Sequence, residues 1–248
     1  MTAKAPGSKT LEMSRYIDLE IYHAVERSHP FYGEMIEALV ARCGDFLQDR
    51  GESRLLELGA GTGLATEAFL GFDHLEITAI DIDEECCRIL EERLHPRVIT
   101  SQGDAVGWCE PGAFDLTLSV FAHDHIHHDE AEAFIHNIHQ NLKPGGLYLM
   151  GGELLPPYET PEERREALYR YHTFIINQAL REESFELAQI EINALKSGLQ
   201  MIGDFKRHEE MFEAEMQAAP FELVEKIKIG PNQPGDVGGV FVYAYRAL

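Results

Sequence analysis

Residues 55–63 read LLELGAGTG, an apolar run that ends in an acid and continues into three glycines at alternate positions. The run predicts a buried strand, and glycines after a strand let the backbone approach a ligand because side chains would block it. A dinucleotide fingerprint needs G-x-G-x-x-G, whereas this loop is G-x-G-x-G. A P-loop needs Lys and Ser/Thr after its last glycine, but Leu64 and Ala65 follow here. We therefore expect a ligand site without a phosphate clamp, with a helix starting after the glycines.

Acids stand where three predicted strands end. Glu57 precedes the glycines, and there it would repel a pyrophosphate but suit an ammonium or sulfonium group. Asp81 lies 22 residues after Gly59, where a carboxylate can accept both ribose hydroxyls. Asp104 follows the third strand and could accept from an adenine amino group. Any one of these acids could be a simple strand-end cap, but together with the loop they favour a nucleoside site.

Five short apolar runs with turn signals alternate with helical patterns through the first part of the chain. Between the fourth and fifth runs, the apolar residues of 129–142 recur at helical spacing, so one face of that helix is expected to pack on the sheet. This alternation predicts a parallel sheet with crossover helices. The five predicted strands are residues 54–59, 75–81, 97–101, 114–119 and 146–151.

The remaining segments add helices and a hairpin to this core. Residues 16–47 read as two helices broken near Pro30, after a disordered arm at residues 1–10. About two further helices follow the fifth strand, opened by the capping-box pair Thr160 and Glu163 and stopped at Ser197-Gly198. Residues 221–229 and 238–247 predict an antiparallel hairpin at the sheet edge.

We therefore predict a single α/β domain over residues 1–248. Its parts are an N-terminal arm with lid helices (1–50), a ligand-binding core (51–155), a helical insertion that forms the substrate pocket (156–220) and a C-terminal strand hairpin (221–248).

In these motifs the chain resembles the class I S-adenosylmethionine-dependent methyltransferases. Five motifs occur in the family's order within about residues 50–155: ELGAGTG (57–63), AIDID (79–83), GDA (103–105), FDLTLS (114–119) and LKPGG (142–146). The resemblance implies a Rossmann-like fold with a seven-stranded, mainly parallel sheet and an antiparallel last strand. It also implies S-adenosyl-L-methionine as cofactor, bound by Glu57, Gly59, Ala60, Gly61, Gly63, Asp81, Ile82, Gly103, Asp104, Ala105 and Ser119, with Tyr16 or Tyr22 reaching inward from the lid.

The loop SVFAHDHIHH after the fourth strand would face the transferable methyl group, and the helical insertion would build the acceptor pocket. His125 and His172 are the candidate bases because imidazole titrates near working pH, and Tyr171 joins them as a catalytic candidate. Substrate contacts are expected from His123, Glu153 and Tyr169, and the aromatic residues of LYRYHTF (168–174) could surround a sulfonium. Six of the twelve histidines lie between residues 123 and 139, so a metal is an alternative, but we assign none.

Composition limits the partners. The formal net charge of -22 repels polyanions, so nucleic-acid binding is not expected. The sequence has no long apolar segment and no CxxC among its four cysteines, and this predicts a cytoplasmic protein without a membrane, disulfide or zinc role. The acceptor is therefore expected to be a small molecule, and a homodimer remains an open alternative to a monomer.

Two other functions fit the same cofactor motifs. One is a methyltransferase-like enzyme that cyclises or cleaves S-adenosylmethionine itself and releases methylthioadenosine, as azetidine-2-carboxylic acid synthases do. The other is a non-catalytic protein that only binds the cofactor. The motifs for the cofactor do not separate the first alternative from methyl transfer.

Overall fold

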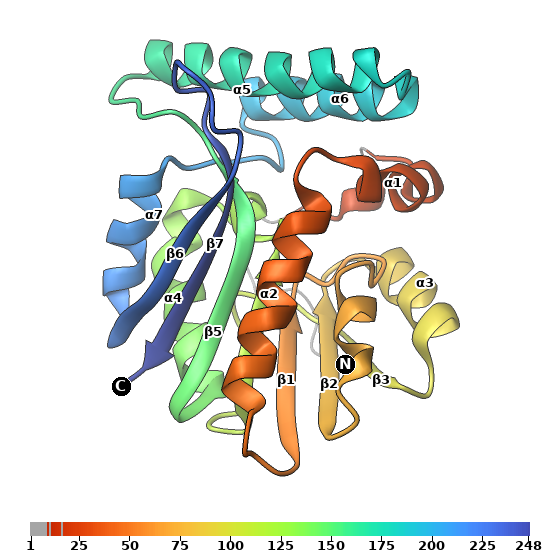
Figure 1. The fold of residues 1–248 in the computed structure, drawn as a ribbon, viewed down its shortest axis with the longest axis vertical. Coiled ribbons are helices and arrows are strands. Elements are labelled where there is room, and N and C mark those ends of the chain that lie inside the picture. The colour runs from red at the N-terminus through yellow and green to blue at the C-terminus, as the bar shows by residue number, and fades with distance from the viewer. Residues whose placement is uncertain (1–8, 10, 16) are drawn as a thin grey trace.

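A seven-stranded sheet forms the centre of the molecule in a computed structural model that describes residues 9, 11–15 and 17–248 (Figure 1). The strand order is β3-β2-β1-β4-β5-β7-β6. The strands are β1 (Ser53–Leu58), β2 (Leu75–Asp81), β3 (Val98–Gln102), β4 (Phe114–Val120), β5 (Leu142–Leu154), β6 (Phe221–Gly230) and β7 (Gly239–Ala247).

Strand direction agrees with the predicted topology. β1 pairs in parallel with β2 and β4, while β2 pairs with β3 and β4 with β5 in the same way. β7 runs antiparallel to both β5 and β6. The predicted seven-stranded sheet with an antiparallel last strand and an edge hairpin is therefore confirmed. Because parallel strands end at one edge, the segments after β1, β2 and β4 meet there.

Helices cover both faces and the carboxyl edge of the sheet. Figure 1 shows α2 across one face, α4 and α7 on the other, and the α5–α6 pair lying over the carboxyl edge. The helices are α1 (Leu19–Val25), α2 (Tyr32–Leu47), α3 (Glu84–Leu94), α4 (Ala131–Asn141), α5 (Pro161–Arg181), α6 (Phe185–Gln200) and α7 (Glu209–Glu215), with 3-10 turns η1 (Met13–Arg15), η2 (Glu26–Ser28), η3 (Thr66–Gly71), η4 (His123–His125), η5 (His128–Glu130) and η6 (Met216–Ala218). No helix of the described residues is long and apolar enough to cross a membrane.

The core divides between the two faces because successive strand side chains point to opposite sides. Leu55 of β1 packs in a cluster with Met35 and Leu39 of α2. Its neighbour Leu56 packs in the second cluster, which includes Phe134 of α4. The buried run LLEL therefore packs against helices on both faces of the sheet, as expected for a central strand of a parallel sheet.

Local signals account for several helix boundaries. Thr160 and Glu163 form the predicted capping box at the start of α5. The predicted break near Pro30 separates α1 from α2. The predicted stop at Ser197-Gly198 is wrong, since α6 continues to Gln200 and ends at Met201 in the left-handed conformation.

The glycine loop differs from the expectation of a helix directly after it. Gly59, Gly61 and Gly63 all have positive φ, and the Gly63 N–H donates to the Ala60 carbonyl at 2.9 Å, which closes a turn. A Cβ at Gly59 would lie 2.6 Å from the Ala122 Cβ, so close approach demands glycine there. Because the glycines keep the chain turning, the first helical segment is only the 3-10 turn η3 from Thr66.

Candidate active site

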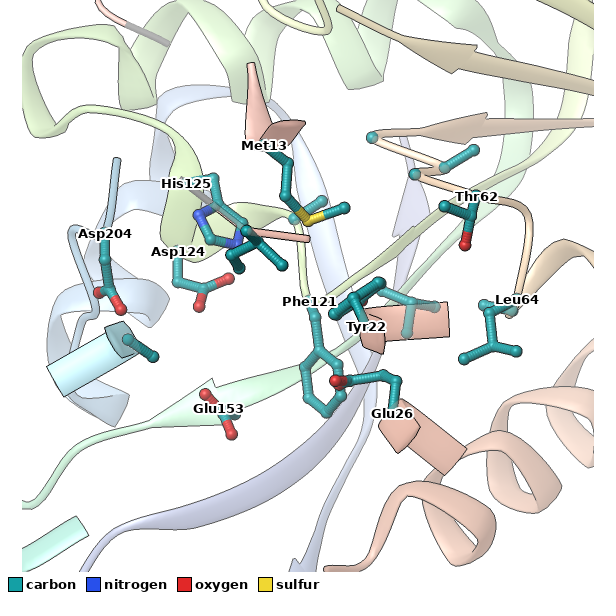
Figure 2. A pocket seen from close by; sticks show the side chains of 18 of the residues that line it. Met13, Tyr22, Glu26, Thr62, Leu64, Phe121, Asp124, His125, Glu153 and Asp204 are labelled. Atoms are coloured by element: carbon teal, nitrogen blue, oxygen red, sulfur yellow. The ribbon is translucent and has the colours of Figure 1, made fainter. Parts of the chain in front are cut away.

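A cavity of about 160 Å³ lies at the carboxyl edge of the sheet (Figure 2). Its lining comes from the glycine loop, the ends of β2 and β5, residues 120–126, the N-terminal segment 11–32, α6 and the segment before α7. The predicted lid therefore contributes directly to the wall through Leu11, Met13, Ile17 and Tyr22. Tyr16 and most of the predicted arm at residues 1–10 lie outside the described residues.

Glu57 at the end of β1 is a buried carboxyl group in this lining. Its Oε2 accepts a hydrogen bond from the Thr66 hydroxyl at 2.6 Å. Burial raises the pKa of Glu57 to about 8, because a charge without water around it is costly. A ligand that brings an ammonium group would stabilise the ionised form and so bind well here.

Asp81 closes the adjacent strand β2 and also lines the cavity. Its Oδ2 accepts from the Gly61 N–H at 2.7 Å, and its Oδ1 accepts from the Asp83 N–H at 2.8 Å. Burial raises the pKa of Asp81 to about 6. A carboxylate has about four acceptor sites, so capacity remains for two hydroxyl donors. The loop and the acid are thus held together before any ligand binds.

Ile82 and Ala105 line the cavity, and the GDA segment (103–105) lies at that end of it. Asp104 is buried beside this lining; its Oδ1 accepts from the Val106 N–H at 3.0 Å, while its Oδ2 has no partner among the described residues. Gly103 does not line the cavity, because a side chain there would meet Trp108 at 2.6 Å. An unsatisfied acceptor beside two apolar walls fits a flat ring with an amino donor.

The aromatic wall differs from the one expected on LYRYHTF. Tyr169 is 47% exposed, and Tyr171 and His172 are fully buried without lining the cavity. Glu191 of α6 lies between His172 and the cavity, since it lines the cavity and contacts that histidine. The second helix of the insertion, not the first, therefore faces the ligand space.

Three other aromatic side chains take this place: Tyr22, Tyr32 and Phe121. Phe121 follows β4 directly and adopts a φ of 48°, a left-handed conformation that is costly for a bulky residue. Its N–H donates to the Gly151 carbonyl at 2.9 Å, which helps to hold that conformation. The position directly after the fourth strand was a usable sequence signal for Phe121, whereas nothing local marked Tyr32.

The histidine loop is divided by its folding into two 3-10 turns, η4 and η5. His125 lines the cavity and its Nδ1 is hydrogen-bonded to the Gly203 carbonyl. His123 lies outside the cavity lining, with its Nε2 2.7 Å from Glu215 Oε2 and its ring against Phe134 and Phe212. Burial lowers the pKa of His123. Its packing therefore makes it a structural histidine in this structure rather than one that faces the ligand space.

Ser119 and the other histidines of residues 123–139 do not line the cavity. The Ser119 hydroxyl is buried and lies 2.8 Å from the Tyr148 hydroxyl, outside the cavity. Within the described part of the chain no group of three or more His, Cys, Asp or Glu side chains is placed to hold a metal ion.

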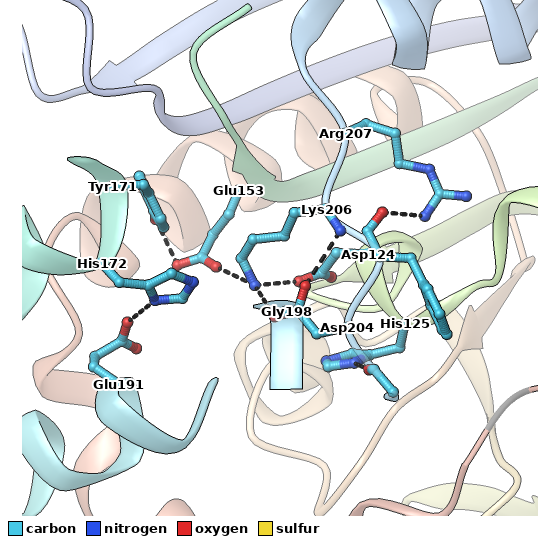
Figure 3. Close-up of polar contacts among 12 residues, drawn as sticks. Asp124, His125, Glu153, Tyr171, His172, Glu191, Gly198, Asp204, Lys206 and Arg207 are labelled. Carbon is cyan, nitrogen blue, oxygen red and sulfur yellow. Dashed lines mark hydrogen bonds and ion pairs between the residues drawn. The ribbon is translucent and has the colours of Figure 1, made fainter. Parts of the chain in front are cut away.

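Lys206 forms the centre of a buried ionic network at the other end of the cavity (Figure 3). Its Nζ lies 2.9 Å from Asp124 Oδ2, 3.0 Å from Glu153 Oε2 and 2.9 Å from Asp204 Oδ2. Burial alone would lower the pKa of Lys206, but the three carboxylates outweigh it and raise the pKa. Sequence reasoning missed Lys206 because two of its three partners, Asp124 and Glu153, are far away in the chain.

A second layer of the network supports Glu153 and Glu191. The Tyr171 hydroxyl donates to Glu153 Oε1 at 2.5 Å, and His172 Nδ1 lies 2.9 Å from Glu191 Oε2. His29 Nε2 lies 2.9 Å from Glu153 and 3.6 Å from Glu191. Burial would lower the pKa of His29, but the carboxylates raise it to about 9. Of the residues expected in the acceptor pocket, only Glu153 and His125 face the cavity, and Tyr171 and His172 stand behind it.

Comparison with known proteins finds a domain match for part of the chain. Residues 55–146 match the model of a methyltransferase domain. No curated protein matches the chain. The matched residues contain the glycine loop, Glu57 and Asp81, which line one end of the cavity, and the buried Asp104, which does not line it.

Solved structures share the fold at low sequence identity. A protein described as a candidate sarcosine dimethylglycine methyltransferase from Galdieria sulphuraria has a TM-score of 0.61 and 12% identity, over 86% of this chain and 85% of that one. The geranyl diphosphate C-methyltransferase from Streptomyces coelicolor has a TM-score of 0.60 and 10% identity, over 86% and 80%. The [4+2]-cyclase SpnF has a TM-score of 0.57 and 18% identity, over 84% and 80%.

At such identities the structural likeness shows the fold, and a fold alone does not determine the reaction. The domain match and the fold agree with the order of the sequence motifs. Residues 55–146 therefore match a methyltransferase domain, and the sheet topology is that of the Rossmann-like fold of class I S-adenosylmethionine-dependent methyltransferases.

Proposed function

We propose that this protein is an enzyme that transfers the methyl group of S-adenosylmethionine to a small-molecule acceptor. The observation that carries the proposal is a cavity with two different ends. One end has the loop, Glu57 and Asp81 within the matched domain, and the other has the ionic network around Lys206.

The first end suits S-adenosylmethionine in each of its parts. Glu57 would hold the ammonium group, and Asp81 would accept from the ribose hydroxyls. The free Oδ2 of Asp104 would accept from the adenine amino group while Ile82 and Ala105 flank the ring. The aromatic rings of Tyr22, Tyr32 and Phe121 would face the sulfonium, which cation–π attraction favours.

The bound cofactor supplies a methyl group already activated by its positive sulfur. The protein then has to align an acceptor with that carbon and keep water away, and alignment alone can provide a large part of the acceleration. Leu11 and Met13 close the cavity over the glycine loop, and Ile190 and Ala194 of α6 close it over the acceptor side.

The test combines binding with product analysis. Calorimetry on the wild-type protein should detect S-adenosylmethionine, and Asp81→Ala should weaken its binding at least tenfold because two hydroxyl acceptors are lost. With a small-molecule extract, mass spectrometry should find S-adenosylhomocysteine only when an acceptor is present. Methylthioadenosine formed without an acceptor would instead establish cleavage of the cofactor, and an unchanged affinity of Asp81→Ala would contradict the cofactor site.

A further inference from the structure

The acceptor end of the cavity is more acidic than its cations can balance. Its lining contains five carboxyl groups, against Lys206 and a protonated His29, which leaves a formal charge of −3 when all five are ionised. These carboxyl groups are Glu26, Asp124, Glu153, Glu191 and Asp204.

Both cations are already engaged by carboxylates. Lys206 contacts three of them within 3.0 Å, and His29 lies between Glu153 and Glu191. Neither is available to a carboxylate or phosphate on an acceptor. An anionic acceptor would therefore enter a negative, water-poor space without a counter-charge, which is strongly unfavourable.

Glu26 is the exception among these carboxyl groups, because its side chain has no partner among residues 9, 11–15 and 17–248. It belongs to η2 in the lid, is only 6% exposed and lines the cavity. No hydrogen bond or ion pair between described residues engages its side chain, which points into the cavity in Figure 2. A buried carboxyl group without a donor is costly, so a group that supplies one is expected to bind there.

We propose that the acceptor is a small molecule with a primary or secondary amine, that its ammonium binds to Glu26, and that Glu26 removes the proton before methylation. The proposal rests on the function proposed above and names the class of its substrate.

The chemistry balances with one proton transfer and one displacement. The ammonium gives a proton to the Glu26 carboxylate and becomes a neutral amine. The nitrogen lone pair then forms the bond to the methyl carbon, while the carbon–sulfur bond breaks and its electron pair goes to sulfur. The product is a methylated ammonium together with S-adenosylhomocysteine, and Glu26 returns its proton to solvent when the product leaves.

The surroundings of Glu26 bring its proton affinity toward that of a buried amine. Burial raises the pKa of Glu26 to about 7; His29 and Lys206 oppose this rise, and Glu191 and Glu153 add to it. Tyr22 of α1 and Tyr32 of α2 also face it without carrying charge at neutral pH. Burial and the nearby sulfonium would lower the pKa of the ammonium, so the two values approach each other.

The first experiment measures binding to the protein saturated with S-adenosylhomocysteine. The probes are ethylamine, butylamine and 2-phenylethylamine, each beside the alcohol and the carboxylic acid of the same skeleton. By calorimetry at pH 8 we expect at least one amine to bind tenfold more tightly than its alcohol and acid. Glu26→Gln should remove that preference. The matched control Glu20→Gln, an exposed acid in the same lid, should keep it.

The second experiment follows methyl transfer to the same probes with labelled S-adenosylmethionine at saturation. In wild type, kcat/KM for the amine should rise with pH through about 7 as Glu26 ionises. Glu26→Gln should lose about 100-fold in rate and also lose this rise, as expected when a general base is removed. Glu26→Asp should restore part of both, which a merely structural role would not produce.

Each result separates this proposal from the function proposed above. If none of the amines binds better than its alcohol and acid, or if label goes only to alcohols or acids, the amine proposal is wrong while the cofactor site stands. An unchanged pH profile in Glu26→Gln would also overturn it. Failure of wild type to bind S-adenosylmethionine would overturn the proposed function itself. Because Glu26→Gln breaks no side-chain contact with the described residues, the variant is expected to fold, and a thermal melt checks this.

Discussion

At the scale of single residues, Glu57 shows how burial prepares an acid for a cation. The glycines beside it provide space, but its raised pKa indicates which ligand is favoured. An anionic ligand would increase the cost of ionising Glu57, while an ammonium group would remove most of it. The same reasoning separates Glu26 from Glu153, because Glu153 already has Lys206 and His29 as partners.

The affinity for S-adenosylmethionine should therefore depend on pH. Binding through Glu57 needs an ionised carboxylate, with a pKa of about 8, and a protonated α-amino group, which titrates at roughly 7.7–8.0. Calorimetry should show an affinity that rises toward about pH 8 and falls above it. Glu57→Gln should bind about 100-fold more weakly and lose the rise on the acid side. The exposed acid in Glu52→Gln serves as control, and a wild-type affinity that is flat from pH 6 to 9 would refute the role of Glu57.

The free energy of unfolding of the ligand-free protein should fall as the pH rises and Glu57 ionises, whereas the affinity for the cofactor should rise. Since the pKa of Glu57 is raised in the folded state, its ionisation costs stability once the pH exceeds its ordinary value of 4.5, and the cost is complete above about 8. Glu57→Gln should therefore increase the free energy of unfolding relative to wild type more at pH 9 than at pH 5. Urea unfolding at the two pH values measures this difference, and an equal effect at both would contradict it.

At the scale of elements, the N-terminal segment acts as a cover for the glycine loop. The Ser14 N–H donates to Asp83 Oδ2 at 2.7 Å, which anchors η1 at the start of α3. Leu11 and Met13 then reach the cavity, and the Met13 Cε would lie 3.8 Å from a Cβ at Gly61.

Removing the apolar cover should mainly speed the release of the cofactor. The double substitution Leu11→Ser with Met13→Ser is expected to increase the dissociation rate of S-adenosylmethionine about tenfold, because less apolar surface is buried over it. Ser14→Ala is the control, since its backbone bond to Asp83 is kept. Stopped-flow displacement measures the rate, and equal rates in the double variant and wild type would show that the segment does not cover the ligand.

The capping box of α5 should contribute to stability without affecting the cofactor. Thr160→Ala loses the hydrogen bond that the Thr160 hydroxyl oxygen accepts from the Glu163 N–H, and it should lower the free energy of unfolding by about 1 kcal/mol. Because α5 does not line the cavity over the glycine loop, the affinity for S-adenosylmethionine should stay within about twofold of wild type. Urea unfolding measures the stability, and calorimetry measures the affinity for S-adenosylmethionine. A large loss of affinity would contradict the prediction that the capping box does not affect cofactor binding.

At the scale of the whole molecule, Lys206 joins parts of the chain that are far apart in sequence. Its ion pairs connect η4 after β4, the end of β5 and the segment before α7. Arg207 extends these links, since its guanidinium donates to the carbonyls of His123 and Ile126. The helical insertion is thereby fastened to the sheet edge by charges as well as by apolar packing.

Lys206→Met should be destabilised by about 3–5 kcal/mol at neutral pH, because three buried carboxylates lose their shared cation. In wild type the pKa of Glu153 is held well below its ordinary value, so the network is complete at neutral pH and is lost in acid. The difference in the free energy of unfolding between the variant and wild type should therefore shrink toward pH 4, because the carboxyl groups that lost Lys206 take up protons there. Lys196→Met on α6 is the control. A difference in the free energy of unfolding that does not change with pH would contradict the ionic role of Lys206.

The sequence by itself determined the order of strands and helices, the parallel core and the acids at the ends of β1 and β2. These features follow from local periodicity, turn residues and the rule that parallel strands end at one edge. Short-range chemistry also determined the capping box of α5 and the break between α1 and α2. The 3-10 turn after the glycine loop was not predicted, because three glycines with positive φ at alternate positions override the usual helical start.

Only the tertiary structure decided which side chains face the ligand space. The helical periodicity of the sequence could not show that α6 lies between α5 and the cavity. In the structure, Tyr171 therefore contacts Glu153 and His172 contacts Glu191, and neither side chain lines the cavity. Lys206 left no sequence signal, because its partners Asp124 and Glu153 are distant along the chain. Glu26 left none either, because its burial in the cavity wall depends on how the lid packs on the sheet. Periodicity encodes which face of an element is apolar, whereas the pairing of buried charges depends on how those faces are assembled.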